Sequence, residues 1–331
     1  MSSSSGSEPP LGESARLALD EVEEAEAILA QNPPKAEAAL GEAAAAGRGS
    51  GWLTAAFAAP GFAWLGFYLL APLVFIVVVS FWTPDQSLGF VKTWTISNYT
   101  GLFHDSTYWG NMLTSFETSL IAVAACLVFG FPVAYFLALK VEKLQNQIAL
   151  FIIALAPFWT SFLTRAIAWT FPLMGRQGAL NQLLLKAHIV SQPVDALGFS
   201  TLSVRLAMIQ LYILFMVTPL FFTLAQVDRT AIEAARDLGG NWLNTFKEVV
   251  LPQTMPGIVI GSIFIFVLTM GEYGTVQVVG GGNITSVGTI VNSKISAIEY
   301  PQGAASAVLL VVALMVGVFV ITRFSNLREE L

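Results

Sequence analysis

The sequence has 331 residues, of which 55% are hydrophobic and only 11% are charged, and its formal net charge is −6. A soluble globular domain carries about 25% charged residues, so the composition argues against a protein whose whole surface faces water. The net charge belongs mainly to one segment, because residues 8–42 hold nine acidic residues against Arg16 and Lys35. We therefore expect a membrane protein with an acidic N-terminal segment.

Residues 1–50 are rich in Ser, Ala, Glu and Pro and contain no aromatic residue. Such a segment buries too little apolar surface to offset the entropy lost on ordering, which predicts a disordered or weakly helical tail. No apolar core follows a basic start, as it would in a signal peptide. We expect this tail to stay in the cytoplasm.

Residues 51–331 are predicted to form the membrane domain, because apolar runs of membrane length follow one another from Trp52 onward. A helix needs about 20 apolar residues to cross the bilayer, and backbone in lipid must satisfy its own hydrogen bonds. The fold class predicted is therefore all-α, with six transmembrane helices. The predicted spans are 53–81, 112–139, 147–170, 204–226, 258–279 and 304–322.

The loops between these runs predict an orientation. Lys and Arg are denser in the loops that share a side with the N-terminus, so both termini are predicted to be cytoplasmic. On the other side, residues 171–203 contain the leucine-rich stretch GALNQLLLKAHI, which predicts a short amphipathic helix on the outer surface. Cys126 lies in an apolar run and is expected to be a buried hydrophobe, and no metal site is expected.

The loop between the fourth and fifth runs, residues 228–252, is the most informative segment. A first helix is predicted from Asp228, which can cap it, to Leu238, where Gly239 and Gly240 can end it. A second short helix is predicted from Trp242 to Val250, broken by Pro252 before the next span. Two short helices at a sharp angle would form a compact knob.

The knob resembles the coupling loop of ABC-importer permeases. That pattern is E-A-A, three residues, G, nine residues, I, one residue and L-P, and only Val249 departs from it, in place of Ile. A loop that merely reverses the chain is the alternative. The residues that match or flank the pattern, and that the resemblance assigns to ATPase coupling, are Glu233, Ala234, Ala235, Asp237, Gly239, Leu251 and Pro252.

The resemblance extends from about Trp64 to the C-terminus. The stretches APFWTSFLTRAIAW (156–169), GALN (178–181), EAARDLGG (233–240) and LPQTMPGI (251–258) are similar to permeases of the spermidine/putrescine class. This resemblance implies a type I, MetI-like permease in a bacterial inner membrane that translocates a polyamine.

The same resemblance implies several partners. These are a pair of ATPase subunits that use ATP and Mg, a second and related permease chain, and a periplasmic substrate-binding protein. The chain has no G-x-x-x-x-G-K-[ST] phosphate loop, so we expect no ATPase activity and no bound cofactor in this chain. No catalytic residue and no nucleic-acid partner are expected.

Polar and aromatic residues within the runs are candidates for a substrate path. A charge at the bilayer centre costs about 2.5–3.5 kcal/mol on insertion scales and calls for a partner or a wet path. Aromatic rings can also bind ammonium groups. The alternative is that Arg165 pairs with a carboxylate as a structural lock and that the aromatic residues only pack. The candidates are Glu117, Tyr135, Trp159, Arg165, Trp169, Glu272 and Tyr273.

Other functions stay open at this point. Within the same class, the substrate could be an opine, an amino-acid derivative, thiamine or an iron chelate. An ion-coupled secondary transporter would need midplane ion sites and inverted repeats, and a membrane scaffold would not need buried charges.

Overall fold

The computed structural model describes residues 51–85, 89–170 and 175–329. The predicted tail, 1–50, lies outside the described residues. The chain divides into two units, residues 1–73 and 74–331. The described part of the first unit is the start of helix α3 (Gly51–Val79), which includes Pro60 and Pro72.

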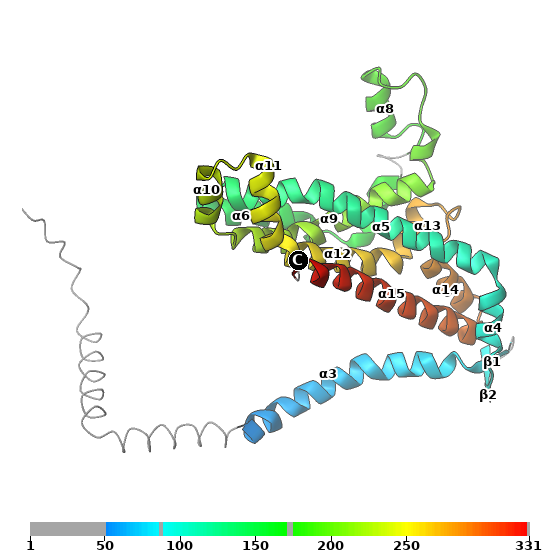
Figure 1. The fold of residues 1–331 in the computed structure, drawn as a ribbon. Helices are drawn as coiled ribbons and strands as arrows, with labels where there is room; N and C mark the ends of the chain where they lie inside the picture. The colour runs from blue at the N-terminus through cyan, green and yellow to red at the C-terminus, as the bar shows by residue number, and fades with distance from the viewer. Residues whose placement is uncertain (1–50, 86–88, 171–174, 330–331) are drawn as a thin grey trace, which may run out of the picture. The chain divides into compact units, whose positions relative to one another are not determined.

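The second unit is built around long helices (Figure 1). Helix α9 (Thr201–Ala225) packs along both α5 (Ser106–Tyr135) and α12 (Leu251–Met270), and α15 (Tyr300–Glu329) packs on α12. Close packing depends on a small residue, because a Cβ added at Gly257 would lie 2.3 Å from the Thr223 hydroxyl oxygen. Small residues at helix contacts are typical of membrane bundles, where they let backbones approach closely.

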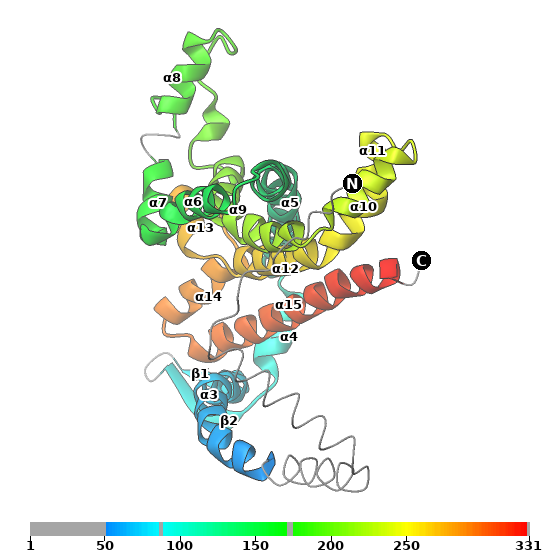
Figure 2. The same ribbon diagram turned by 90° about the vertical axis from the view of Figure 1, so that its left-hand side faces the viewer.

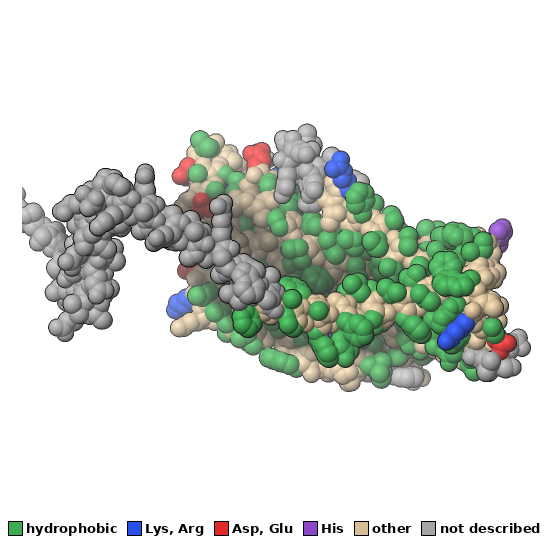
Figure 3. Space-filling view, turned by 90° about the horizontal axis from the view of Figure 1, so that it is seen from below, with side chains coloured by type: hydrophobic (Ala, Val, Ile, Leu, Met, Phe, Trp, Pro, Cys, Tyr) green, Lys and Arg blue, Asp and Glu red, His purple; other side chains and the backbone are tan. Residues whose placement is uncertain are grey.

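Among the described residues, five helices are long and apolar enough to cross a membrane. They are Phe57–Val79, Ser106–Lys140, Thr201–Ala225, Trp242–Met270 and Tyr300–Arg323. Large hydrophobic side chains are exposed along these helices, as expected for surfaces that face lipid or another subunit. On the face in Figure 3, hydrophobic side chains are widespread, and charged side chains are few and lie near its edges.

The predicted third span, 147–170, is not one straight helix. It consists of α6 (Leu144–Leu155), a 3-10 turn η2 (Ala156–Trp159) and α7 (Phe162–Ala168), and the two halves bend by 84°. Pro157 lies in the 3-10 turn, and Thr160 has extended backbone. Because proline lacks the N–H that an α-helix requires, the run breaks here. The structure thus has a sixth span only if this bent pair is counted as one.

The predicted fifth span, 258–279, also needs correction. Helix α12 ends at Met270, and a separate helix α13 (Gly274–Val279) follows, so Glu272 lies in a break between helices. The expectation that Pro252 ends the preceding helix is wrong as well. A π-helical turn, η5 (Phe246–Val250), joins α11 (Trp242–Thr245) to α12, and Pro252, the second residue of α12, lies inside this continuous helix from Trp242 to Met270.

The shorter elements gather at the two ends of the bundle (Figures 1 and 2). Helices α10 (Arg229–Asp237) and α11 lie at one end, and α13 and α14 (Val287–Ser296) lie at the other. The remaining elements are the antiparallel hairpin β1 (Trp82–Asp85) and β2 (Gly89–Trp94), α4 (Ser97–His104), the π turn η1 (Phe136–Lys140), α8 (Ala179–Lys186) and the 3-10 turn η4 (Asp195–Leu197).

Candidate functional site

Helix α10 begins and ends as its sequence predicts. The Asp228 carboxylate accepts a hydrogen bond from the backbone N–H of Thr230 at 2.8 Å, which caps the helix. The Thr230 hydroxyl also donates to this carboxylate, and these hydrogen bonds hold the pKa of Asp228 below its usual value. At the other end, Gly239 has φ of +84°, a backbone conformation that glycine adopts without strain.

Gly240 has a second role in this turn that the motif does not reveal. A Cβ at Gly240 would lie 2.5 Å from the backbone oxygen of Ala235. The backbone N–H of Gly240 donates to that same oxygen at 2.9 Å. Only glycine therefore allows the chain to fold this tightly against the end of α10 and to enter α11 at an angle.

The predicted coupling residues lie on a largely exposed segment. Glu233, Ala234 and Asp237 are exposed on α10, and Pro252 is exposed at the start of α12. Ala235 and Leu251 are partly buried, and Gly239 is exposed at the turn. Sequence analysis missed three apolar side chains on the same surface: Leu238 is 90% exposed, Trp242 62% and Leu243 47%.

At the other end of the bundle, Glu272 lies in the break between α12 and α13. One carboxylate oxygen accepts from the backbone N–H of Thr275 at 2.7 Å, and the other accepts from the Tyr212 hydroxyl of α9. The Ser286 hydroxyl donates to the Glu272 backbone oxygen at 2.9 Å. Among the described residues, no Lys or Arg forms an ion pair with Glu272. Neutral donors alone hold this carboxylate.

Glu117 lies in a different setting on α5. Its carboxylate forms an ion pair with Arg205 of α9, with 2.9 Å between Oε1 and Nη2. Arg205 also donates from Nε to the Thr118 hydroxyl at 3.3 Å. The Glu117 side chain is 58% exposed, whereas that of Arg205 is 22% exposed. Glu117 therefore has its own counter-ion and faces away from the core of this chain.

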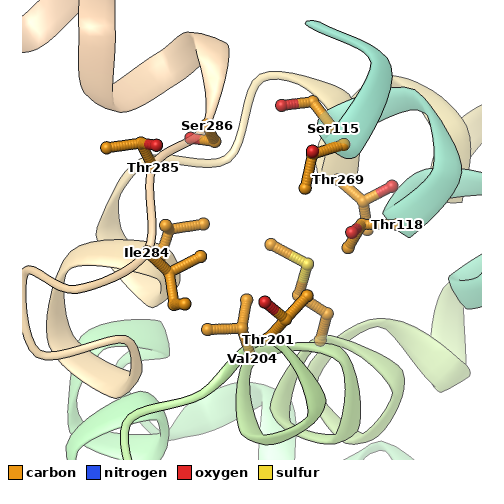
Figure 4. A pocket seen from close by; sticks show the side chains of 11 residues that line it. Ser115, Thr118, Thr201, Val204, Thr269, Ile284, Thr285 and Ser286 are labelled. Carbon is orange, nitrogen blue, oxygen red and sulfur yellow. The ribbon is translucent and has the colours of Figure 1, made fainter. Parts of the chain in front are cut away.

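A small pocket lined by hydroxyl groups includes residues that neighbour or contact these two carboxylates (Figure 4). Thr118, the neighbour of Glu117, lines it on one side, and Ser286, which contacts Glu272, lines it on another. The pocket holds about 20 Å³, room for about one water molecule. The hydroxyl residues that line it are Thr114, Ser115, Thr118, Thr201, Thr269, Thr285 and Ser286.

Most of these hydroxyls already donate to acceptors of the chain. Thr114 donates to the oxygen of Gly110, Thr269 to that of Ile265 and Ser286 to that of Glu272. A hydroxyl that has donated its proton keeps oxygen lone pairs as acceptors. The pocket therefore offers acceptors to a cation or to water.

The structure places Arg165 and Trp169 at or just after α7, which packs on the helices that flank the Glu272 contact with Tyr212. Arg165 lies on α7, which packs on α13 and α9, and its guanidinium lies 5.5 Å from the ring centroid of Phe158. The indole of Trp169 donates to the side-chain oxygen of Gln210 at 3.0 Å. Tyr273 follows Glu272 in the break and is 39% exposed.

Two aromatic candidates lie elsewhere. Trp159 is 80% exposed at the end of the 3-10 turn. Tyr135 stacks on Phe131 at the far end of α5. It is 18 residues from Glu117, or about 27 Å along the helix axis, so Tyr135 lies far from Glu117 and from the hydroxyl pocket beside it.

Sequence analysis also missed Tyr212 and Arg205, the partners of the two carboxylates. No local pattern marks them, because Tyr212 contacts Glu272 across 60 residues of chain. The sequence did contain a pattern that indicates the hydroxyl pocket. Thr114, Ser115, Thr118 and Ser119 place four hydroxyl groups at helical spacing in an apolar run.

Comparison with known proteins gives clear relatives. The chain is 33% identical to the spermidine/putrescine transport system permease protein PotB of Haemophilus influenzae, over 81% of this chain and 93% of that protein. It is also 33% identical to PotB of Escherichia coli K12, over 81% of this chain and 96% of that protein. The chain belongs to the ABC-transporter permease family that includes PotB. No family model matches the sequence.

Further comparisons agree with this family. The inner membrane ABC transporter permease protein YdcU of E. coli K12 is 28% identical over 73% of this chain and 80% of that protein. Among solved structures, a chain of a bacterial alginate ABC transporter bound to an alginate-loaded periplasmic protein is similar, with a TM-score of 0.58 and 17% identity. That likeness covers 83% of this chain and 94% of the other.

These findings confirm the predicted fold class. The permease is a mostly helical, multi-pass membrane protein with the architecture of ABC-importer permeases. Its relatives are transport subunits, not enzymes.

Proposed function

We propose that this permease imports a polyamine such as spermidine or putrescine, delivered by a periplasmic binding protein and driven by separate ATPase subunits. The observation that carries the proposal is the 33% identity to PotB proteins across 81% of the chain. Glu272 supports a cationic substrate, because neutral donors hold its carboxylate and no Lys or Arg of the described part of the chain pairs with it.

The proposed path begins at the end of the bundle that holds α14. A hollow of about 540 Å³ there is lined by Ser293, Lys294 and Glu299, and it shares Ile284 and Thr285 with the hydroxyl pocket. The pocket itself, at about 20 Å³, is too small for a polyamine. In the conformation described, the path is therefore closed between the outer hollow and Glu272, and it must widen for transport.

The ATPase subunits are proposed to act on the opposite end of the bundle, at the knob formed by α10 and α11. The carboxylate of Glu233 would meet a basic group of an ATPase subunit, and the exposed Leu238 and Trp242 would enter an apolar cleft of that subunit. Because η5 joins α11 to α12 without a break, a push on the knob would act directly on the helix that ends next to Glu272.

This drive requires subunits beyond this chain. ATP and Mg would bind only to the ATPase pair, and this chain would hydrolyse no ATP. A second, related permease would complete the path, and the exposed carboxylate of Glu117 would face it or the path. Both termini of this chain would lie in the cytoplasm, as the loop charges predict.

The test uses the assembled transporter with its binding protein in proteoliposomes. Spermidine uptake driven by ATP is expected for the unaltered complex. Glu233→Lys is expected to abolish uptake and to reduce copurification of the ATPase while the chain still inserts into the membrane. Glu142→Lys, at an exposed position between η1 and α6, is the matched control and should keep both. Normal uptake by the Glu233 variant would contradict the coupling assignment, and no spermidine uptake by the unaltered complex would contradict the substrate.

A further inference from the structure

Arg165 has hydrogen-bond donors that nothing in the described part of the chain accepts. Its Nε and Nη1 atoms are buried, and neither has a hydrogen-bond partner. The guanidinium instead lies over the rings of Phe158 and Phe162, at 5.5 and 5.8 Å from the centroids. A buried donor without an acceptor costs about 1–3 kcal/mol, and more for a charged group. The residue therefore lacks its acceptor in this conformation.

The acceptor it lacks must be reachable from inside the protein, because the chain itself encloses the two nitrogens. Phe162 packs against Tyr212 with 5.4 Å between ring centroids, and Tyr212 donates to Glu272. Helix α7, which carries Arg165, packs on α9 and on α13, the helices on either side of this hydrogen bond. Arg165 and Glu272 are thus neighbours of one tyrosine, and Glu117, the other intramembrane carboxylate described, is already paired with Arg205.

A second buried group at this contact is also unsatisfied. The Thr275 hydroxyl has no hydrogen-bond partner, and Thr275 is fully buried on α13, which packs on α7. Three of the four buried side-chain atoms without partners in the described residues belong to Arg165 and Thr275. Unpaired polar groups on two helices that pack together are not explained by one poorly placed side chain. We infer that these groups have hydrogen-bond partners in another conformation, in which α7 and α13 pack differently.

Both charged groups lie beside breaks in the helices that carry them. Arg165 lies on α7, directly after the 84° bend, and Glu272 lies between α12 and α13. Movement at either break would not unravel a helix, because the backbone is already interrupted there. Small hinge motions at such positions are a usual way to switch between two contacts.

We propose that Arg165 is a positioning residue that competes with the cationic substrate for Glu272. In the conformation described, neutral donors hold Glu272, and its charge is free to bind an ammonium group. In the alternate conformation, α7 moves toward the break and Arg165 replaces the Tyr212 hydroxyl on Glu272. An internal cation then neutralises the carboxylate and releases the substrate. This inference rests on the proposed function, because it requires a cationic substrate.

The proposal predicts the effect of Arg165→Gln on both KM and kcat. Without the competing charge, the substrate would be held more tightly and leave more slowly. KM and kcat for spermidine should therefore both fall, each by about fivefold or more. Arg165→Lys retains a cation, so its values should lie between those of the unaltered and the Gln transporter. A merely structural role would lower the amount of assembled complex and leave KM and kcat per complex unchanged.

The experiment that tests the proposal is a double-mutant cycle on the assembled transporter, with Arg165→Gln, Glu272→Gln and the pair. Uptake of labelled spermidine and ATPase activity without substrate are both measured. If the two charges act as a pair, each single change alters the substrate-free ATPase rate, and the double variant resembles either single variant. Effects that multiply in the double variant, or an Arg165→Lys variant indistinguishable from Arg165→Gln, would overturn the proposal.

The two readouts also separate this inference from the proposed function. If the unaltered transporter does not take up spermidine, the proposed substrate is wrong, whereas the ATPase cycle still decides whether Arg165 and Glu272 are coupled. If spermidine is taken up and the effects of the two substitutions multiply in the double variant, the proposed substrate is supported and the proposed role of Arg165 is overturned.

Discussion

The two candidate carboxylates, Glu117 and Glu272, differ in what holds them. Arg205 compensates the charge of Glu117, with 2.9 Å between the charged atoms. Within residues 51–85, 89–170 and 175–329, the Glu272 carboxylate receives hydrogen bonds from Tyr212 and the backbone of Thr275 and from no other group. A hydroxyl and an amide stabilise a carboxylate without cancelling its charge, so Glu272 keeps the capacity to bind a cation.

The residue-scale prediction is that Glu272→Gln weakens transport of a dication more than transport of a neutral solute. A hydrogen bond to a charged group contributes about 1.5–3 kcal/mol, so KM for spermidine should rise about tenfold or more. Gln keeps an oxygen that can accept from Tyr212, and the helix break should stay intact. Uptake kinetics in proteoliposomes measure this, and equal effects on both solutes would indicate a structural role.

Glu117→Gln is the matched comparison for that measurement. Removing this carboxylate leaves the partly buried Arg205 without its ionic partner, which destabilises the contact between α5 and α9. The expected result is a lower melting temperature of the complex, with little change in KM for spermidine. A rise in KM as large as that of Glu272→Gln would place both carboxylates on the substrate path.

At the scale of elements, hydropathy located the membrane helices better than it located their breaks. The runs 147–170 and 258–279 are apolar throughout, but they break near Thr160 and near Glu272. Hydropathy counts apolar side chains, whereas a break depends on backbone torsions. Pro157 lies at one break and Pro252 begins an unbroken helix, so proline alone did not predict the outcome. The broken segments carry Arg165 and Glu272, the two charged residues on which the proposed competition with substrate depends.

The α10–α11 turn gives a prediction about its two glycines. Gly240→Ala would bring a Cβ to 2.5 Å from the Ala235 oxygen and should displace the end of α10. Gly239→Asn should be milder, because Asn tolerates positive φ and open space surrounds this position. Uptake should fall about tenfold or more for Gly240→Ala if the turn is displaced by about 1 Å, with ATPase activity no longer stimulated by the loaded binding protein. Equal behaviour of the two variants would show that the tight turn is not required.

The segment around α8 gives a prediction about pH. Arg176 donates two hydrogen bonds to Asp195, at 2.5 and 3.0 Å, and the hydrogen bond and the charge lower the pKa of Asp195 and raise that of Arg176. A carboxyl whose pKa is lowered on folding contributes stability above its unfolded pKa and loses it as pH falls through the folded value. Buried Asn181 holds the same segment through Gly175 and Val194.

Amide exchange of residues 175–198, corrected for its intrinsic pH dependence, should therefore be constant from about pH 8 to about pH 5. It should increase once the pH falls below about 3.9, the usual pKa of Asp. Because both side chains are exposed, the effect should be small and should weaken at high salt. Asp195→Asn should remove the acid step, and an unchanged step in that variant would assign it to another group.

At the scale of the whole molecule, the sequence predicted the class of protein, because composition and span length are local features; the assignment of residues 228–252 to ATPase coupling stays a prediction. The sequence did not predict which side chains meet. Tyr212 and Glu272 are 60 residues apart, and Arg205 and Glu117 are 88 residues apart. Such pairs depend on how α5, α9 and α12 pack, which periodicity in one sequence does not determine.

The two ends of the second unit have different roles in the proposed mechanism. The knob formed by α10 and α11 lies at one end of the bundle, and α13 and α14 lie at the other (Figure 1). Glu272 lies in the break before α13, and the hydroxyl pocket includes Ser286, which caps α14. Helix α12 joins the two ends, since it continues from η5 to the break at Glu272. We infer that movement of this one helix can couple an event at the knob to the width of the path.

The most direct test of this account places a photo-crosslinking amino acid at Leu238, the most exposed large side chain of the knob. In the assembled transporter, irradiation should link this residue to the ATP-hydrolysing subunit, and the yield should change when vanadate traps the closed ATPase pair. The same group placed at Leu183 of α8, 63% exposed, should not link to the ATPase. A Leu238 residue that links only to the binding protein, or that never links to the ATPase, would contradict the account.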